Sequence, residues 1–218
     1  MEIELLTGVA RRADDMTSKA RGGSQGELVV GELNGKYYEQ IMRGNGFVYS
    51  QAAAGVAPIA LAATSSPIIW NPSDSNTFLQ LIAVKIGLVT VGTPVAGMFE
   101  YTFQNNMGAS IGTGAPVVSL TQVAGVNLRL SGGKASVMRF APATITLTTA
   151  NTFLCPVGLS MATAATTAIA PFGGFKDDVD GMIVVPPGST FGVAANAALG
   201  STYCISIFGL ELPIPLIV

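Results

Sequence analysis

Histidine is absent from the sequence, and this absence excludes several common catalytic and metal-binding arrangements. A Ser-His-Asp triad, a Cys-His dyad, a histidine general base and a His-based zinc site all need an imidazole ring. Cysteine is scarce, because only Cys155 and Cys204 are present, both in apolar, strand-like segments. In a chain made in a reducing compartment, we expect these two residues to be buried thiols rather than a disulfide.

Charged residues are also few, and they are unevenly distributed. Lys, Arg, Asp and Glu number 24 in 218 residues, and 13 of these lie within residues 1–50. Soluble domains average roughly 25% charged residues. A stretch this poor in charge, yet rich in Thr, Ser, Asn, Gly and Ala, either enters a membrane or has much of its surface covered by neighbouring molecules. The two signs are nearly balanced, with a net charge of −2, so we expect no nucleic-acid partner, which would require clustered Lys and Arg.

Long apolar runs are missing, although the mean hydropathy is +0.51. A membrane-spanning helix needs about 20 predominantly apolar residues. The longest charge-free stretch, Phe140–Phe175, is rich in Thr and contains Pro142, Pro156 and Pro171. The segment Met1–Leu6 has acidic residues where a signal peptide has a basic region. The sequence therefore predicts no membrane partner and synthesis in the cytoplasm.

The N-terminal segment has a helical pattern. Leu6, Val9, Ala13 and Met16 recur at three- and four-residue spacing with charged residues between them, which predicts a short amphipathic helix within residues 1–21. Such a short helix is only marginally stable alone. We therefore expect its apolar side chains to contact another surface, either on the same domain or on a neighbouring subunit.

The rest of the chain has the pattern of an all-β protein. From Leu28 onward, short apolar segments alternate with Gly, Pro and Asn, which predicts an antiparallel β-sandwich, with the jelly roll as the favoured topology. We expect residues 35–218 to form this sandwich and residues 1–34 to form an N-terminal arm that contains the short helix. Strands are expected at Tyr37–Met42, Phe47–Gln51, Thr77–Val91, Gly97–Gln104, Val117–Thr121, Val126–Leu130, Ala135–Phe140, Ala143–Thr149, Phe153–Ser160, Met182–Val185, Thr190–Ala195 and Tyr203–Leu212.

The acidic residues do not match a known catalytic or metal-binding pattern. The cluster Asp177–Gly181 resembles half a calcium loop, but Lys176 and Pro187 occupy the first and last ligand positions of an EF-hand alignment. We interpret the cluster as a solvated turn. A glycosidase would need two carboxylates about 5–10 Å apart, and the single Trp70 offers little aromatic surface for sugar stacking. The sequence therefore predicts no enzymatic activity, no cofactor and no metal.

Two groups of residues are candidates for protein interfaces. The aromatic residues Tyr37 and Tyr38 lie at the start of the sandwich, where they form either a recognition surface or ordinary packing within the sheet. The C-terminal segment Leu212–Val218 is apolar, and its alternating prolines favour an extended path. We expect this tail to be buried at a subunit interface or on the larger assembly that the protein binds, with packing in its own subunit as the alternative. The candidate interface residues are Leu6, Val9, Met16, Tyr37, Tyr38, Ile214, Leu216 and Ile217.

Two sections of the chain resemble a known family. Gly35–Gln40 followed by Arg43–Asn45 is similar to the opening of small structural proteins of tailed-bacteriophage virions. Ile183–Gly188 and Phe208–Pro213 resemble the last two strands of these proteins, where a Pro-Pro-Gly turn precedes the final strand. The resemblance implies a jelly-roll or β-sandwich protein, typically trimeric, that decorates or cements the capsid.

The resemblance and the composition together lead to one main hypothesis with two alternatives. The main hypothesis is a non-enzymatic virion structural protein, a homotrimeric capsid decoration or cement protein on the capsid exterior, which binds and stabilises the major capsid protein lattice. The first alternative is a tail, baseplate or head-fibre component of the virion. The second, from another class, is a carbohydrate-binding jelly-roll module.

Overall fold

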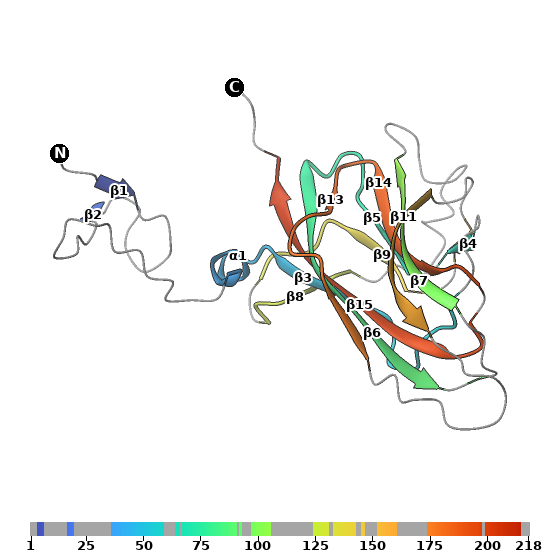
Figure 1. Ribbon diagram of the computed structural model, residues 1–218. Helices are drawn as coiled ribbons and strands as arrows, with labels where there is room; N and C mark the ends of the chain where they lie inside the picture. Colours follow the sequence, from blue (N-terminus) through green and yellow to red (C-terminus); the bar gives the residue numbers. More distant parts are fainter. Residues whose placement is uncertain are drawn as a thin grey trace.

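Two antiparallel β-sheets packed face to face make up most of the computed structural model (Figure 1). The structure describes residues 36–58, 67–90, 92, 97–105, 124–130, 133–142, 152–158, 174–197 and 199–214, and the backbone alone at 4–6, 17–19, 64–65, 145–146 and 159–160.

The first sheet runs in the order β12-β6-β15-β3-β8, with β13 also paired to β6. Its strands are β12 (Phe175–Asp178), β6 (Thr77–Thr90), β15 (Thr202–Pro213), β3 (Gly46–Ser50), β8 (Val126–Asn127) and β13 (Val184–Val185). The second sheet runs in the order β11-β7-β14-β5-β9. Its strands are β11 (Thr152–Ser160), β7 (Gly97–Asn105), β14 (Ser189–Ala195), β5 (Ile68–Trp70) and β9 (Arg139–Ala141).

The strand pairing is that of a jelly roll. In chain order, the eight main strands are β3, β5, β6, β7, β11, β12, β14 and β15. The first pairs with the eighth, the second with the seventh, the third with the sixth and the fourth with the fifth, and successive pairs alternate between the two sheets. This nested pairing confirms the predicted antiparallel sandwich and its jelly-roll topology.

The core follows from the two-residue alternation of strands. On β14, Phe191, Val193 and Ala195 face the other sheet and are fully buried among aromatic and aliphatic side chains. The intervening residues of β14 are buried as well, which makes every residue from Ser189 to Ala195 inaccessible. The second sheet is therefore covered on both faces around its central strand, as its run of small and apolar residues predicts.

Near the N-terminus, the predicted helix within residues 1–21 is wrong where the structure describes that segment. Glu4–Leu6 and Thr17–Lys19 form the strands β1 and β2 of an antiparallel hairpin. Thr17 and Ser18 have low helix propensity, and a short isolated helix gains too few hydrogen bonds to offset its nucleation cost. The hairpin gives the same segment backbone hydrogen bonds without helical nucleation.

The strand predicted at Tyr37–Met42 is also wrong, because Tyr38–Met42 forms the short helix α1. Glu, Gln and Met are good helix formers, and the Arg43 guanidinium pairs with the Glu39 carboxylate one turn earlier. The Asn45 amide donates to Gln40 Oε1 at 2.8 Å and closes the end of the helix. Within the described residues, α1 is the only helix.

Further differences between prediction and structure concern the presence and the start of individual strands. The sequence prediction missed β5 and β12, and β9 begins four residues after the start of the predicted strand Ala135–Phe140. The strand expected at Val117–Thr121 lies outside the described residues. Ala143–Thr149 is described only at β10 (Ile145–Thr146), which pairs with β4 (Thr64–Ser65).

Candidate functional site

A buried carboxylate joins three segments of the sandwich at one end of the core. Glu211 on β15 faces inward and is 6% exposed. Its Oε1 accepts hydrogen bonds from the Tyr49 hydroxyl and the Ser136 hydroxyl, each at 2.5 Å, and its Oε2 accepts one from the backbone N–H of Val137 at 3.0 Å. Burial raises the pKa of the Tyr49 hydroxyl well above its ordinary value, and the adjacent Glu211 carboxylate raises it further. Tyr49 therefore stays protonated and serves as a hydrogen-bond donor.

A second tyrosine–carboxylate pair lies elsewhere in the same core. The Tyr101 hydroxyl on β7 donates to Asp177 Oδ2 on β12 at 2.7 Å, and this bond crosses from one sheet to the other. Burial is the main cause of the raised pKa of Tyr101. Burial also raises the pKa of the nearby Cys155 thiol, and the Asp177 charge adds to this effect. A thiol of this kind is a poor nucleophile at neutral pH, because the thiolate is the reactive form.

These two carboxylates are too far apart to act as a glycosidase pair. Both residues lie on strands that pair with β6. Asp177 on β12 lies opposite Val84 on one side of β6, and Glu211 on β15 lies opposite Leu79 on the other side. Strand rise and strand spacing place their backbones about 19 Å apart. Retaining and inverting glycosidases need carboxyl groups about 5–10 Å apart.

The remaining acidic cluster is divided between different surroundings. Asp177 points into the core, whereas Asp178 pairs with Lys176 at 2.6 Å on the outer face. Asp180 lies in a turn with a φ of 54°, where it accepts hydrogen bonds from Lys36 and Tyr37. The Lys36 hydrogen bond, followed by that of Tyr37, lowers the pKa of Asp180. The structure thus corrects the interpretation of one solvated turn, since Asp177 and Asp178 belong to β12. Nowhere in the described segments do three His, Cys, Asp or Glu side chains gather as metal ligands.

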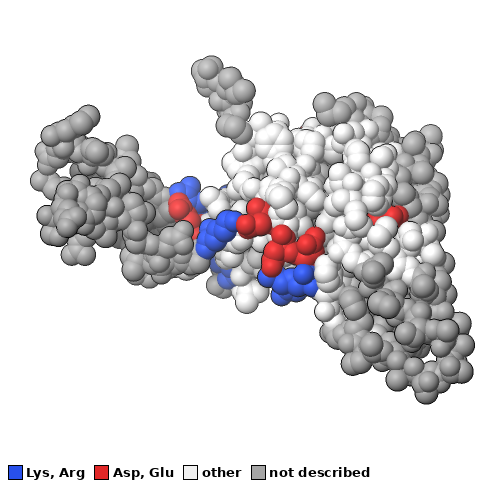
Figure 2. Space-filling model, in the orientation of Figure 1, with Lys and Arg blue, Asp and Glu red and all other residues white. Residues whose placement is uncertain are grey.

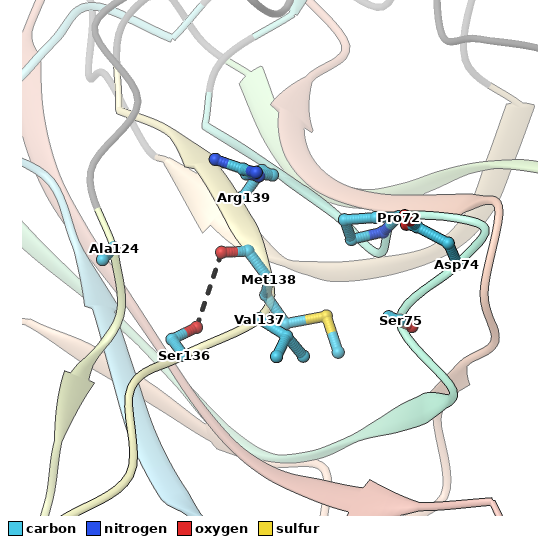
Figure 3. Close-up of a pocket in the computed structure, with 8 residues that line it drawn as sticks. All are labelled: Pro72, Asp74, Ser75, Ala124, Ser136, Val137, Met138 and Arg139. Carbon is cyan, nitrogen blue, oxygen red and sulfur yellow. Dashed lines mark hydrogen bonds between the residues drawn. The ribbon is translucent and has the colours of Figure 1, made fainter.

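A polar pocket of about 500 Å³ lies beside β9 (Figure 3). Arg139 and Asp74 supply opposite charges to its walls, and the figure shows them coming from different segments of the chain. Its two hydroxyl groups are already engaged, because Ser136 donates to Glu211 and Ser75 donates to Asn71 Oδ1 at 2.5 Å. The pocket therefore offers hydrogen bonds to a small polar molecule but contains no activated nucleophile. Its lining residues are Pro72, Asp74, Ser75, Ala124, Ser136, Val137, Met138 and Arg139.

An apolar groove of about 380 Å³ occupies one open flank of the sandwich, where the edge strand β11 approaches β13. We call it the flank groove. Its apolar lining includes Phe103, Leu154, Met182, Val184, Pro186 and Phe191. Met182 is 83% exposed and Val184 is 48% exposed, whereas most large apolar side chains of the sandwich are buried. Exposed apolar side chains gathered at one groove are typical of an interaction site.

Charge is confined to a small part of the visible surface. On the face shown in Figure 2, most charged side chains form one band in which the two signs are interleaved, and the described surface beside the band is white apart from one isolated acidic group at the right. Three exposed ion pairs, Lys36–Asp180, Arg43–Glu39 and Lys176–Asp178, account for much of the charge described in residues 36–43 and 174–180. Paired surface charges of this kind contribute little to binding.

The predicted interface residues are not brought together in the described structure. Tyr38 is 40% exposed on α1, Tyr37 donates its hydroxyl proton to Asp180, and the Ile214 N–H donates to Asn76 O at 3.0 Å. The interface prediction is therefore untested at these positions. Leu6 is described by its backbone only, and Val9, Met16, Leu216 and Ile217 lie outside the described residues.

Sequence reasoning missed the flank groove, although one signal was present. Met182 and Val184 are two positions apart, so a strand directs both side chains to the same face. The sequence predicts a strand at Met182–Val185, and Met182, two residues before β13, is an unusual exposed residue there. The contribution of Leu154 depends on the approach of β11, which the sequence alone does not show.

Comparisons with known proteins give no relative for this chain. Models of protein families, curated proteins and solved structures each yield no match. The fold itself therefore defines the class, which is a jelly-roll β-sandwich. Among the described residues, no helix is long and apolar enough to cross a membrane.

Glu100 gives a pH-dependent prediction. Its side chain is 4% exposed on the outer face of β7, and Oε1 has no hydrogen-bond partner within the described structure. Burial raises the pKa of this carboxyl above 4.5, so the folded state binds the proton more tightly than the unfolded state. The free energy of unfolding should therefore fall as the pH rises from 4.5 through the raised pKa.

Replacing Glu100 with Gln should remove this loss. We expect Glu100→Gln to unfold at higher denaturant concentration than the parent at pH 7 and at a similar concentration at pH 3.5, measured by circular dichroism. The exposed Asp74 provides the matched control, because Asp74→Asn should not change the pH profile in this direction. A parent protein as stable as Glu100→Gln at pH 7 would contradict the account.

Proposed function

We propose that this chain is a non-enzymatic virion structural protein, a decoration or cement protein that binds the exterior of a capsid and stabilises the major capsid protein lattice. The observation that carries the proposal is the division of roles among its side chains. The buried carboxylate of Glu211 and the partly buried carboxylate of Asp177 are used in hydrogen bonds that hold the sandwich together. Three of the exposed large apolar side chains, Leu154, Met182 and Val184, gather at the flank groove instead.

The composition supports the same function. Beyond residue 50 only 11 charged residues remain, and a soluble monomer normally needs more charge to keep its surface hydrated. A charge-poor surface of this kind is typical of a protein whose surface is largely buried in interfaces with other protein molecules. The resemblance of the first and last segments of the sandwich to small tailed-phage structural proteins adds support, since decoration and cement proteins are found in that family.

We propose that the working form is a homotrimer. An ordinary stable interface covers about 800 Å² on each partner, and each apolar Å² removed from water contributes roughly 25 cal/mol. Charge-poor strands and the exposed flank provide such area, whereas a surface ion pair contributes about 1 kcal/mol or less. A trimer closes its contacts in a ring, so no interface is left open for uncontrolled growth.

Reconstitution tests the proposed function. Purified protein is added to capsids assembled without it, and the bound protein is measured by co-sedimentation with these capsids. Capsids of an unrelated virus are the control. We expect saturable binding to the cognate capsid and a higher temperature of capsid disruption. The absence of saturable binding would overturn the decoration role.

The polar pocket beside β9 supports a second candidate, a carbohydrate-binding jelly roll. Arg139 and Asp74 offer a donor and an acceptor to sugar hydroxyls at its walls. A glycan array separates the two functions, because a decoration protein should give no signal above background. A signal that Arg139→Ala abolishes would favour the glycan-binding function. A tail, baseplate or head-fibre position is distinguished from a capsid position by the copy number per particle.

A further inference from the structure

The flank groove lies between two strand edges with no paired neighbour among the described strands. β13 pairs with β6 on one side, and β11 pairs with β7 on one side. The groove between them is apolar and rimmed by Met182, Val184 and Leu154, which are all at least 40% exposed. Burying these side chains would remove apolar surface from water, so an apolar occupant is favoured.

The chain itself contains a segment with matching chemistry. Residues 214–218 follow β15 with the sequence Ile-Pro-Leu-Ile-Val, which has four large aliphatic side chains and no charged side chain. Pro213 and Pro215 lack backbone N–H groups, so this segment cannot add to a strand edge as a regular β-strand. It would bind in an extended conformation through its side chains, and a groove accommodates that mode better than an open sheet edge.

Geometry disfavours binding of this tail to the groove of its own chain. Ile214 is held beside Asn76 by a hydrogen bond, and Val185 pairs with Leu79 on the other side of β6. Two strand spacings and three residues of strand rise separate Ile214 from Val185 by about 14 Å. The four remaining residues extend about 14 Å at most, which only just equals that separation. They would be used up in reaching the groove and could not fill it.

We propose that the flank groove binds the C-terminal tail, residues 214–218, of a second copy of this chain. A tail that belongs to a neighbouring copy approaches from outside and is not limited by the path across β6. Passing each tail to the next copy around a ring would close a homo-oligomer. The inference rests on the oligomeric form proposed above, and the experiments below use the isolated protein, so their failure is distinguishable from failure of capsid binding.

Cross-linking between differently labelled copies tests whether the tail binds the groove of another copy or the groove of its own chain. Unlabelled Val218→Cys is mixed with ¹⁵N-labelled Val184→Cys, and disulfide-linked peptides are identified by mass spectrometry, which also separates any link made by Cys155 or Cys204. We expect a link between residue 218 of one copy and residue 184 of the other. A chain that carries both Val184→Cys and Val218→Cys, diluted until it is monomeric, should give no link between these two residues. A link within one chain, or no link in the mixture, would overturn the proposal.

A peptide experiment tests the groove without relying on cysteine variants. A fluorescent synthetic peptide of residues 212–218 is titrated into the chain truncated after Pro213, and binding is followed by anisotropy. We expect saturable binding that Met182→Asp weakens by at least about tenfold, because a carboxylate at the groove opposes burial of aliphatic groups.

The matched control is Leu130→Asp, since Leu130 is 84% exposed and does not line the groove. Its left-handed φ of 58° also accommodates Asp. Both variants are checked for unchanged β-sheet circular dichroism. Equal affinity of the Met182→Asp and Leu130→Asp chains for the peptide, or no binding to the truncated chain, would overturn the proposal.

Discussion

Replacing Glu211 with alanine is expected to lower the free energy of unfolding by about 3 kcal/mol. The substitution leaves the buried hydroxyl of Tyr49 without its acceptor and removes the acceptor of the partly buried Val137 N–H. A buried polar group that loses its partner costs about 1–3 kcal/mol. The loss would be measured by urea denaturation followed by circular dichroism at pH 7.

A double-mutant cycle shows whether the hydrogen bond is the cause. Tyr49→Phe removes the hydroxyl and keeps the ring that stacks on Phe47 and Phe140. We expect the combined variant to be less destabilised than the sum of the single variants, with a coupling free energy of about 1–3 kcal/mol. Asp74→Ala, an exposed acidic residue, is the control and should cost less than about 0.5 kcal/mol. Additive effects of Glu211→Ala and Tyr49→Phe would contradict the hydrogen-bonded arrangement.

The second large effect is expected at the centre of the second sheet. Phe191 is 1% exposed on β14, and its ring centroid is 5.1 Å from that of Tyr101. Phe-to-Ala substitutions in protein cores cost about 3–5 kcal/mol. The cost has two parts, the lost transfer free energy of the ring and the cavity that the ring leaves behind. For a chain of this size, Phe191→Ala should lower the melting temperature by about 6–20 °C, measured by differential scanning calorimetry.

Phe153 provides the matched control for Phe191. It lies on β11 of the same sheet, but its side chain is 44% exposed. Phe153→Ala should therefore cost less than about 1 kcal/mol. Equal destabilisation by Phe191→Ala and Phe153→Ala would contradict the assignment of the Phe191 face of the sheet to the core.

The β-sandwich was predictable because its longest strands have a strong apolar pattern. Segments such as Thr77–Thr90 and Thr202–Pro213 contain apolar residues throughout and are bounded by Gly, Pro and Asn. The short strands were harder. β12 is Phe-Lys-Asp-Asp, which reads as a polar turn, and its two acidic side chains are accommodated because Asp177 meets Tyr101 and Asp178 meets Lys176. Those partners come from tertiary packing and not from local propensity.

The candidate site was less predictable than the fold, because it depends on which strand edges approach each other. The sequence shows an apolar tail and an apolar strand at Met182–Val185, but not the groove that β11 and β13 form together. The role of Glu211 was similarly hidden, since Tyr49 and Ser136 are distant in the chain and meet only in the sandwich. The N-terminal prediction failed for another reason. Glu4–Leu6 pairs with Thr17–Lys19, and the local spacing of apolar residues carries no information on this pairing.

The buried carboxylate of Glu211 also connects the fold to the proposed function. A side chain that accepts several short hydrogen bonds holds its strands rigidly and is not available as a general base. Rigid strands present the flank groove in one shape, which favours tight association because little ordering is needed on binding. The same arrangement predicts that variants of Glu211 weaken assembly through loss of stability and not through loss of any reaction.

The most direct test of the structural role is the number of copies in a purified particle. Under the proposed function, virions whose genome encodes this chain would be analysed by quantitative mass spectrometry with isotope-labelled peptides, and the major capsid protein would serve as the internal standard. The decoration role predicts a fixed ratio to the major capsid protein, with copies on the order of hundreds and in multiples of the trimer. A protein that is absent from the particle, or present in only a few copies at one vertex, would contradict it.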